Sequence, residues 1–308
     1  MINWLLIGIG DIAIKRVLPA ILSEPRSRLV GLVTRHPEKA LPYQVPAWAD
    51  LRAAIKESGC HAVYVATPVA LHAEQSILAM RAGLDVLCEK PTAMNYTEAC
   101  AMQQVSVETG RLLGVAYYRR MYPKVNRAKE LIAAGAIGTP VWADATAHSW
   151  LPEDEARAAW RADPALSGGG PLYDIASHRI DLMNYLFGHP RRSTGQLGNA
   201  VHHYAVEDNA TVMMEYAGGV RGMVDVRWHS RIARDEFRIR GTDGELDLSP
   251  LNDARLVTPS GEESIPAPAN LHYPCVEEFV TSALDRTPFR SGIGSAIEVD
   301  WVTAQVLR

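Results

Sequence analysis

The sequence predicts an α/β protein of two domains: a doubly wound parallel sheet, then an α+β domain with a large, open, mostly antiparallel sheet. Over the first 120 residues, short apolar runs alternate with helical patterns. Gly135, Gly138 and Pro140 interrupt the helical pattern, and strand patterns dominate after them. The length of 308 residues suits two domains, at about 150 residues each. We expect the domains to span 1–120 and 121–308.

In the first domain, the apolar runs do not alternate with polar residues, which is typical of strands buried on both faces of a parallel sheet. We expect strands at 4–9, 29–34, 61–66, 85–88 and 112–117. Helical patterns fill the intervals, at about 11–22, 48–57, 69–82 and 96–109. Strands and helices that alternate in this way form a doubly wound sheet with helices on both faces.

In the second domain, a helix at about 122–134 leads into alternating strand patterns. We expect strands at 141–147, 201–204, 211–216, 220–229, 236–241 and 245–248. Glycine-containing turns at 217–219 and 242–244 are typical of hairpins, so the sheet should be mostly antiparallel. Further helices are expected at about 171–186, 273–285 and 296–308.

Composition excludes several classes of protein. With 31 basic and 35 acidic side chains, the net charge is −4, and no basic block favours nucleic-acid binding. The four cysteines show no C-x-x-C spacing, and no metal-site motif occurs, so we expect neither a disulfide framework nor a metal. No apolar run approaches ~18 residues. We therefore expect no membrane partner and a cytoplasmic location.

A glycine pattern follows the first strand. Gly8 and Gly10 are followed by Asp11, Ile12 and Ala13, which gives G-x-G-x-x-A between a predicted strand and a predicted helix. Gly8 allows a tight turn, Gly10 lets the backbone approach a pyrophosphate, and Ala13 permits close helix packing. The pattern predicts dinucleotide binding, the alternative being a strand–helix turn without a ligand. Asp11 would repel phosphate unless its side chain points away.

The end of the second strand selects the kind of dinucleotide. NAD-binding domains usually place an acid there, on the ribose hydroxyls. This chain has Thr34 and Arg35 instead, and the next acid is Glu38, already at a helix start. Arg35 could pair with a 2′-phosphate, which favours NADP; NAD is the alternative, with Arg35 then only a surface residue.

Two further segments carry candidate catalytic groups. Glu89 and Lys90 end the strand at 85–88, and Pro91 constrains the turn on which Lys90 lies. Asp174 and His178 follow three glycines and a proline, and their spacing of four places them on one helix face. A carboxylate beside an imidazole suits general acid–base chemistry. The non-catalytic alternatives are a solvated lysine in a turn and an Asp–His pair on the protein surface.

Five motifs occur in an order that resembles the Gfo/Idh/MocA oxidoreductases, the glucose–fructose oxidoreductase and inositol dehydrogenase group. They are the glycine loop, Thr67-Pro68 with His72, Glu89-Lys90-Pro91, Arg119-Arg120-Met121-Tyr122-Pro123, and Gly168-Gly169-Gly170 with Asp174 and His178. The resemblance covers nearly the whole chain. It implies an N-terminal NAD(P)-binding Rossmann domain and a C-terminal substrate-binding domain whose sheet mediates assembly into a dimer or tetramer.

The resemblance also assigns roles. Lys90, Asp174 and His178 would be the catalytic residues, with His178 exchanging the proton and Asp174 orienting it or binding substrate. The residues expected at the cofactor are Gly8, Gly10, Asp11, Ile12, Ala13, Thr34, Arg35, Thr67, Pro68, His72, Glu89, Lys90 and Arg161. Met121 stands where phenylalanine is commoner in the family. Asp181 is expected to pack or cap, outside the chemistry.

The sequence therefore predicts an NADP-dependent dehydrogenase or reductase that acts on a carbinol or carbonyl of a sugar, cyclitol or related polyol. Two alternatives stay open. One is a redox-neutral glycosidase on the same fold, with retained NAD. The other is a non-catalytic nucleotide-sensing regulator, which we would expect to lack the lysine or the histidine that this chain keeps.

Overall fold

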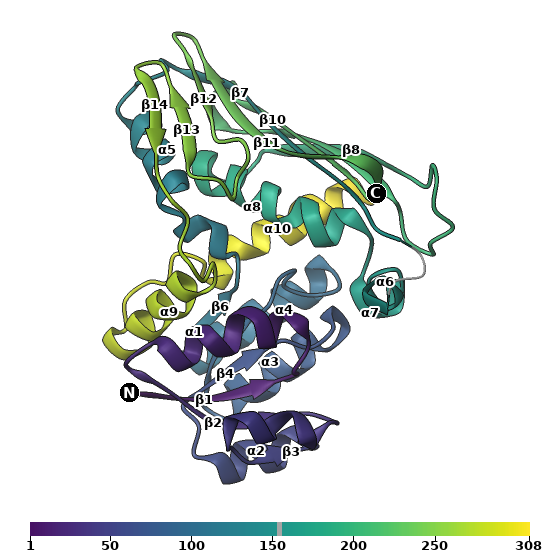
Figure 1. Ribbon diagram of the computed structural model, residues 1–308, viewed down its shortest axis with the longest axis vertical. Helices are drawn as coiled ribbons and strands as arrows, with labels where there is room; N and C mark the ends of the chain where they lie inside the picture. Colours follow the sequence, from purple (N-terminus) through teal and green to yellow (C-terminus); the bar gives the residue numbers. More distant parts are fainter. Residues whose placement is uncertain (153–155) are drawn as a thin grey trace. The chain divides into compact units, whose positions relative to one another are not determined.

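The computed structural model describes residues 1–152 and 156–308, without the side chains of 156–158. By their contacts, the residues form two units (Figure 1). The first contains Met1–Tyr118 and Pro268–Ile297, and the second contains Arg119–Ala267 and Glu298–Arg308. The chain thus passes from the first unit to the second near residue 118. A late segment, which the sequence analysis had placed in the second domain, groups with the first unit.

The first unit is built on a six-stranded sheet in the order β3-β2-β1-β4-β5-β6. All of its neighbouring strands pair in parallel; Trp4, for example, lies opposite Leu29 on one side and Ala62 on the other. The strands are β1 (Ile2–Ile7), β2 (Ser27–Val33), β3 (Ala47–Trp48), β4 (Ala62–Val65), β5 (Asp85–Cys88) and β6 (Leu113–Val115). Since β4 and β5 are buried along their whole length, the apolar runs are explained by coverage on both faces.

Helices connect these strands. They are η1 (Ala13–Val17), α1 (Leu18–Ser23), η2 (Pro37–Tyr43), α2 (Leu51–Ser58), η3 (Val69–Leu71), α3 (His72–Arg81) and α4 (Tyr96–Thr109). Asp50 caps α2 and Asn95 caps α4, each accepting a hydrogen bond from a main-chain N–H in the first turn. The late helix α9 (Tyr273–Asp285) packs against α1. Its Phe279 also contacts β1, because the ring centroids of Phe279 and Trp4 are 5.3 Å apart.

The second unit is built on an eight-stranded sheet in the order β14-β13-β12-β11-β7-β10-β9-β8. Only β7 and β10 pair in parallel, and the other neighbours are antiparallel. The strands are β7 (Pro140–Trp150), β8 (Arg192–Gly198), β9 (Asn209–Glu215), β10 (Arg221–Arg227), β11 (His229–Gly241), β12 (Glu245–Asp247), β13 (Arg255–Thr258) and β14 (Gly261–Ser264). The predicted fold class is confirmed for both sheets.

One face of this larger sheet is buried. Ala143, Ala145 and Ala147 of β7 are buried, whereas the residues between them are partly exposed or at the margin of burial. The remaining helices are η4 (Tyr118–Met121), α5 (Pro123–Ala133), α6 (Ala156–Arg161), α7 (Pro164–Ser167), η5 (Leu172–Ala176), α8 (Ser177–Phe187), η6 (Ala217–Gly219) and α10 (Ile293–Val306). Of these, η5 and α8 contact β10 on the buried face (Figure 1).

Three expectations for this sheet are wrong. Residues 201–204 form a loop, not a strand, because their main-chain N–H groups are turned toward the carboxylate of Asp208. Strand β8 lay outside the prediction because its sequence, RSTGQLG, contains two glycines and little apolar character. The short strands β13 and β14 were also missed: GEES in β14, an edge strand, lacks any apolar alternation, and RLVT in β13 is only four residues long.

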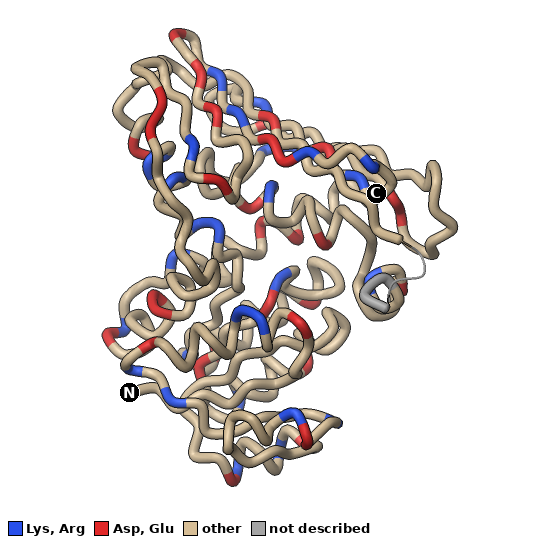
Figure 2. Tube along the Cα trace, in the orientation of Figure 1, with Lys and Arg blue, Asp and Glu red and all other residues tan. Residues whose placement is uncertain are grey.

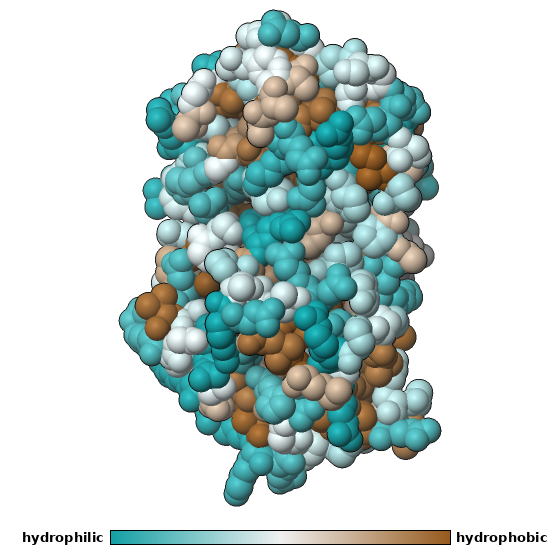
Figure 3. All heavy atoms as spheres, turned by 90° about the vertical axis from the view of Figure 1, so that its left-hand side faces the viewer, coloured by the Kyte–Doolittle hydropathy of each residue, from teal (hydrophilic) through white to brown (hydrophobic). Residues whose placement is uncertain are grey.

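The exposed apolar side chains are dispersed. On the face shown in Figure 3, hydrophobic atoms occur in separate groups among hydrophilic ones. Within the described residues, no helix has the length and apolar character needed to cross a bilayer.

Candidate active site

The glycine-rich loop follows β1 at the carboxyl edge of the parallel sheet. Gly8 has φ +87°, and a Cβ there would lie 2.7 Å from the carbonyl oxygen of Ala66. A Cβ on Gly10 would meet nothing within 4 Å, so the space above this residue is open. The tight turn and the open approach are the two features that a pyrophosphate needs from such a loop, and the loop therefore fits a dinucleotide.

The helix after the loop resolves the position of Asp11. Its carboxylate, 84% exposed, lies 2.9 Å from Nζ of Lys15 one turn later. Asp11 therefore points to a lysine on the helix surface. Ala13 is fully buried and begins η1, a turn with the wider i→i+5 hydrogen bonding that often marks functional sites. Ile12 stays partly exposed.

Cationic side chains gather after β2. Arg35 is exposed, and Thr34 accepts a hydrogen bond from the main-chain N–H of His36 at 3.0 Å. The nearest acid, Glu38, is 3.3 Å from the imidazole of His36. Lys39, which the sequence analysis did not single out, reaches back with Nζ 3.4 Å from the carbonyl oxygen of Ile9 in the glycine-rich loop. Two cations thus accompany the loop on this side.

His72 joins two loops at the same edge of the sheet. Its Nδ1 is 2.9 Å from the carbonyl oxygen of Pro91, and its Nε2 is 3.0 Å from that of Thr67. Burial lowers the pKa of His72, against the opposing effect of these carbonyls. Thr67 also donates a hydrogen bond to Gln75, and Pro68 precedes the first turn of η3. His72 therefore holds the Thr67–Pro68 loop to the turn that contains Lys90.

Glu89 is buried below the lysine. It accepts a hydrogen bond from the Tyr64 hydroxyl at 2.7 Å and lies 3.4 Å from Nε2 of His272. Burial on its own would raise the pKa of Glu89, but His272 and Tyr64 outweigh it, so the pKa lies below its ordinary value. His272 in turn lies against Tyr118, with ring centroids 4.3 Å apart. Glu89 is thus held by interior partners as well as by its strand.

Lys90 follows β5 by two residues at this edge of the sheet, is half-buried, and forms a cis peptide bond with Pro91. Its main-chain N–H lies 3.2 Å from the Glu89 carboxylate. The structure therefore brings Gly8, Thr67, Glu89 and Lys90 to the carboxyl ends of neighbouring parallel strands β1, β4 and β5. This edge is where open α/β sheets bind their ligands.

In the second unit, three glycines precede the helix with Asp174 and His178. Gly168 has φ +82°, and a Cβ there would lie 2.7 Å from the ring of Tyr173. A Cβ on Gly169 would overlap the same ring, and one on Gly170 would overlap the main-chain oxygen of Glu207. Each glycine is therefore required by close approach of a neighbouring group.

Asp174 lies in η5 and His178 in the first turn of α8, along one continuous helical stretch. Asp174 forms an ion pair with Arg161, whose Nε is 3.4 Å away, and the Arg161 guanidinium lies over the ring of Trp160. His178 is buried, with 6% of its surface exposed. Like the glycine-loop helix, this helix begins with i→i+5 bonding.

Asp181 packs, as expected. Its fully buried carboxylate receives two hydrogen bonds from Nε of Arg120 at 2.9 and 3.0 Å and one from Nη2 at 2.6 Å. Burial raises the pKa of Asp181 to about 6, against the charge of Arg120. This pair connects η4 to α8, and so helps to fix the helix that carries His178.

Sequence reasoning missed five residues that support these candidates: Lys39, Tyr64, Tyr173, Glu207 and His272. Lys39 could have been noticed as a second cation four residues after Arg35. Tyr173 and Glu207 gave no such signal, because their importance depends on contacts with glycines that the sequence does not reveal.

The fold and these residues define a nucleotide-binding oxidoreductase with a separate α+β unit. Residues 2–117 match the model of the oxidoreductase family with an NAD-binding Rossmann fold, and residues 125–247 match the Gfo/Idh/MocA C-terminal domain. The chain belongs to the Gfo/Idh/MocA family, and it is an NAD(P)-dependent oxidoreductase.

Named relatives include sugar and cyclitol enzymes. The chain is 27% identical to 1,5-anhydro-D-fructose reductase of Ensifer adhaerens over 293 residues, 91% of this chain and 87% of that protein. It is 25% identical to scyllo-inositol 2-dehydrogenase (NAD(+)) of Bacillus subtilis over 269 residues, 84% of this chain and 77% of that protein. Aldose-aldose oxidoreductase from Caulobacter crescentus shares the fold, with TM-score 0.90, 23% identity, and coverage of 100% and 96% of the two chains.

Proposed function

We propose that the protein is an NADP-dependent dehydrogenase or reductase acting on a carbinol or carbonyl carbon of a sugar, cyclitol or related polyol. The observation that carries this proposal is Lys90 at the carboxyl end of β5, on the same sheet edge as the glycine-rich loop. The names of the two relatives, a reductase of an anhydro sugar and an inositol dehydrogenase, support the substrate class.

In this proposal, Gly8 and Gly10 shape the loop that receives the pyrophosphate, on the main-chain N–H groups of Asp11, Ile12 and Ala13. Thr67, Pro68, His72 and Glu89 form or support the nicotinamide end. When bound, the cofactor supplies or accepts the hydride. Lys90 offsets the negative charge that develops on the substrate oxygen. His178 exchanges the proton of that oxygen, and Asp174 with Arg161 orients the polar groups of the substrate or cofactor.

The preference for NADP is supported by the charges after β2. Arg35 is exposed, and Lys39 approaches the loop at Ile9, so two cations are available to a 2′-phosphate. Glu38, the first acid after the strand, lies 3.3 Å from the imidazole of His36. An NAD-binding domain would instead use a carboxylate at the ribose.

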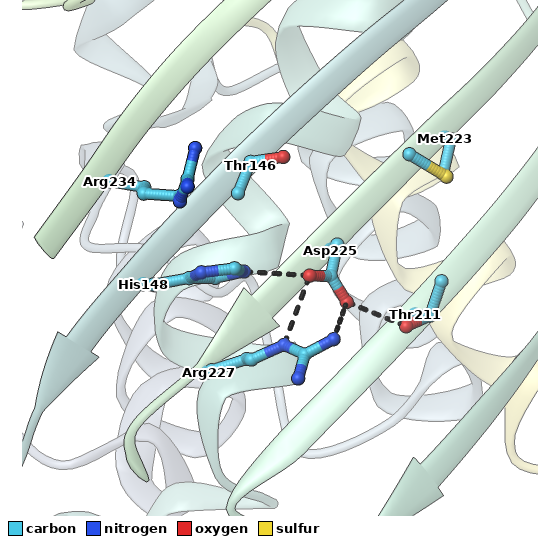
Figure 4. Close-up of a pocket in the computed structure, with 7 residues that line it drawn as sticks. All are labelled: Thr146, His148, Thr211, Met223, Asp225, Arg227 and Arg234. Atoms are coloured by element: carbon cyan, nitrogen blue, oxygen red, sulfur yellow. Dashed lines mark hydrogen bonds and ion pairs between the residues drawn. The ribbon is translucent and has the colours of Figure 1, made fainter. Parts of the chain in front are cut away.

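We also propose that two or more copies associate through the outer face of the eight-stranded sheet. The strands of this sheet contain both basic and acidic residues (Figure 2). The outer face carries a hollow of about 450 Å³, in which His148 and Thr211 bind the Asp225 carboxylate, each at 2.7 Å (Figure 4). Arg227 and Arg234 line the same hollow. A two-fold axis brings such a patch against itself, so mixed charges of this kind can pair across the axis.

The experiment follows nicotinamide absorbance with NADPH and NADH against a panel of ketoses, lactones and inositols. We expect turnover with NADPH, and we expect Lys90→Ala and His178→Ala each to lower it by ~10²-fold or more, the usual size of a general acid–base contribution. Lys56→Ala, at an exposed helical position, is the control and should keep full turnover.

Unchanged turnover in both variants would contradict the catalytic assignment. A preference for NADH would contradict the role of Arg35. Cleavage of a glycoside with retained cofactor and no net nicotinamide turnover would favour the glycosidase, and nucleotide binding without any turnover would favour the regulator.

A further inference from the structure

The helix that carries Asp174 and His178 begins without a cap from its own neighbourhood. Helical hydrogen bonding starts at the carbonyl of Gly170, which accepts from Tyr173 and Asp174. Pro171, at the N-cap position, has no N–H and its side chain forms no capping hydrogen bond. The N–H groups of Gly170 and Leu172 are therefore left for a partner from elsewhere in the chain.

Glu207 is that partner. Its Oε1 accepts a hydrogen bond from the N–H of Leu172 at 3.0 Å, across 35 residues of sequence, and the N–H of Gly170 also binds this side chain. A negative group at a helix N-terminus is favoured by the partial positive charge of the free N–H groups. Glu207 thus supplies the acceptors that the helix start lacks; burial raises the pKa of this carboxyl, and the hydrogen bonds from Gly170 and Leu172 oppose that rise.

The glycines allow this approach. A Cβ on Gly170 would lie 3.1 Å from Cδ of Glu207 and would overlap its main-chain oxygen. A Cβ on Gly169 would lie 3.4 Å from Oε2 of Glu207. At Gly170, the space that a side chain would occupy is therefore taken by the glutamate and its backbone, whereas the Tyr173 ring fills the space at Gly169.

Asp208 anchors this glutamate to the sheet. Its carboxylate accepts hydrogen bonds from the N–H groups of Val201 and His202 and lies 3.0 Å from Nδ1 of His229. Its main-chain N–H donates to Gly198, at the end of β8, and its carbonyl accepts from Trp228, between β10 and β11. The backbone next to Glu207 is therefore fixed by main-chain hydrogen bonds to Gly198 and Trp228.

We propose that Glu207 is a positioning residue, which fixes the start of the helix bearing Asp174 and His178 relative to the sheet. The inference rests on the proposed function, because it matters for catalysis only if those two residues are catalytic. A misplacement of about 1 Å in a catalytic group is enough to cost ~10²-fold in rate, and a rigid support avoids that loss.

The test compares Glu207→Ala with Glu207→Gln, which keeps an acceptor oxygen at the same reach. Glu207→Ala should lower kcat by ~10- to 100-fold while the Kd for NADPH stays within twofold, because Gly8, Gly10 and Arg35 belong to the other unit. Glu207→Gln should recover kcat to within about fivefold of the native protein. Glu215→Ala, an exposed glutamate at the end of β9, is the matched control.

Hydrogen exchange provides a second measurement that needs no substrate. In Glu207→Ala, the amides of residues 170–178 should exchange faster, while those of β9 and β10 keep their native protection. If the native protein shows no nicotinamide-linked turnover, the proposed function fails, and this exchange pattern still decides whether Glu207 holds the helix.

Three outcomes would overturn the proposal. The first is native kcat and native exchange in Glu207→Ala. The second is a loss of protection spread evenly over the second unit, which would indicate general destabilisation. The third is a Glu207→Gln variant as impaired as Glu207→Ala. If Glu207→Ala does not fold, Glu207→Asp, whose shorter side chain withdraws the carboxylate, replaces it in the same comparison.

Discussion

At the scale of single residues, two glycines of one motif have different physical reasons to be glycine. Gly8 has φ +87° and no room for a Cβ, so its constraint comes from the folded chain itself. Gly10 has open space around it, so nothing in the protein excludes a side chain there. The phosphate-loop interpretation supplies a reason from outside the chain, namely the close approach of a pyrophosphate to Gly10.

This difference predicts opposite results for two similar substitutions. Gly10→Ala should keep the stability of the native protein or raise it by ~0.5 kcal/mol, but weaken NADPH binding by at least ~10-fold. Gly8→Ala should lower the free energy of unfolding by ~1–3 kcal/mol through strain. Urea denaturation and nucleotide titration of both variants provide the check. Native affinity in Gly10→Ala would argue against a pyrophosphate at this loop.

At the scale of elements, the helix with Asp174 and His178 is supported at several points. Glu207 binds its N-terminal amides, Tyr173 packs on the glycines, and Asp181 forms a buried ion pair with Arg120. Such a pair fixes the relative positions of the two segments that it joins, but it adds little net stability, because both charges lose their hydration when they are buried. Breaking it, however, leaves one charge buried without its partner.

Asp181→Ala should therefore lower the free energy of unfolding by ~3–5 kcal/mol. Replacing both partners, as in the double variant Arg120→Met with Asp181→Leu, should restore most of that loss, since no charge is left behind. Urea denaturation measures both variants. If the free energy of unfolding of the double variant is lower than that of Asp181→Ala, the ion pair itself adds net stability.

At the scale of the whole molecule, the two sheets differ in how their faces are covered. The parallel sheet is lined by apolar residues on both faces, whereas the larger sheet buries one face and presents ion pairs such as Arg227 with Asp225 on the other. An open face of this size, rich in paired charges, is the surface on which we propose that copies associate.

Association through this face predicts that a charge placed in its hollow dissociates the assembly. Met223→Asp should convert a dimer or tetramer to monomer, because a new carboxylate beside Asp225 would be buried without a partner. Sedimentation velocity at several protein concentrations gives the masses. Val107→Asp, on the 78%-exposed Val107 of α4, is the control and should leave the mass unchanged. A monomeric native protein would contradict the proposal.

Patterns local in the sequence predicted most of the fold. Apolar runs determined β1, β2, β4 and β5 because a strand covered on both faces needs apolar residues throughout. The prediction missed the four-residue strand β13, and it failed for the edge strands β8 and β14, whose composition differs little from that of loops. At these edges, pairing with a neighbouring strand decides the structure, and the strand's own residues contribute little to that choice.

The sequence by itself determined the motifs: the glycine-rich loop, Lys90 before its proline, and the three glycines ahead of Asp174 and His178. These depend on backbone geometry and spacing, which neighbouring residues set. Only the tertiary structure decided what supports them. His72 joins two loops, His272 reaches Glu89 from 183 positions later in the chain, and Glu207 caps a helix across 35 residues. Such contacts join polar groups of distant segments, and only the folded chain brings their partners together.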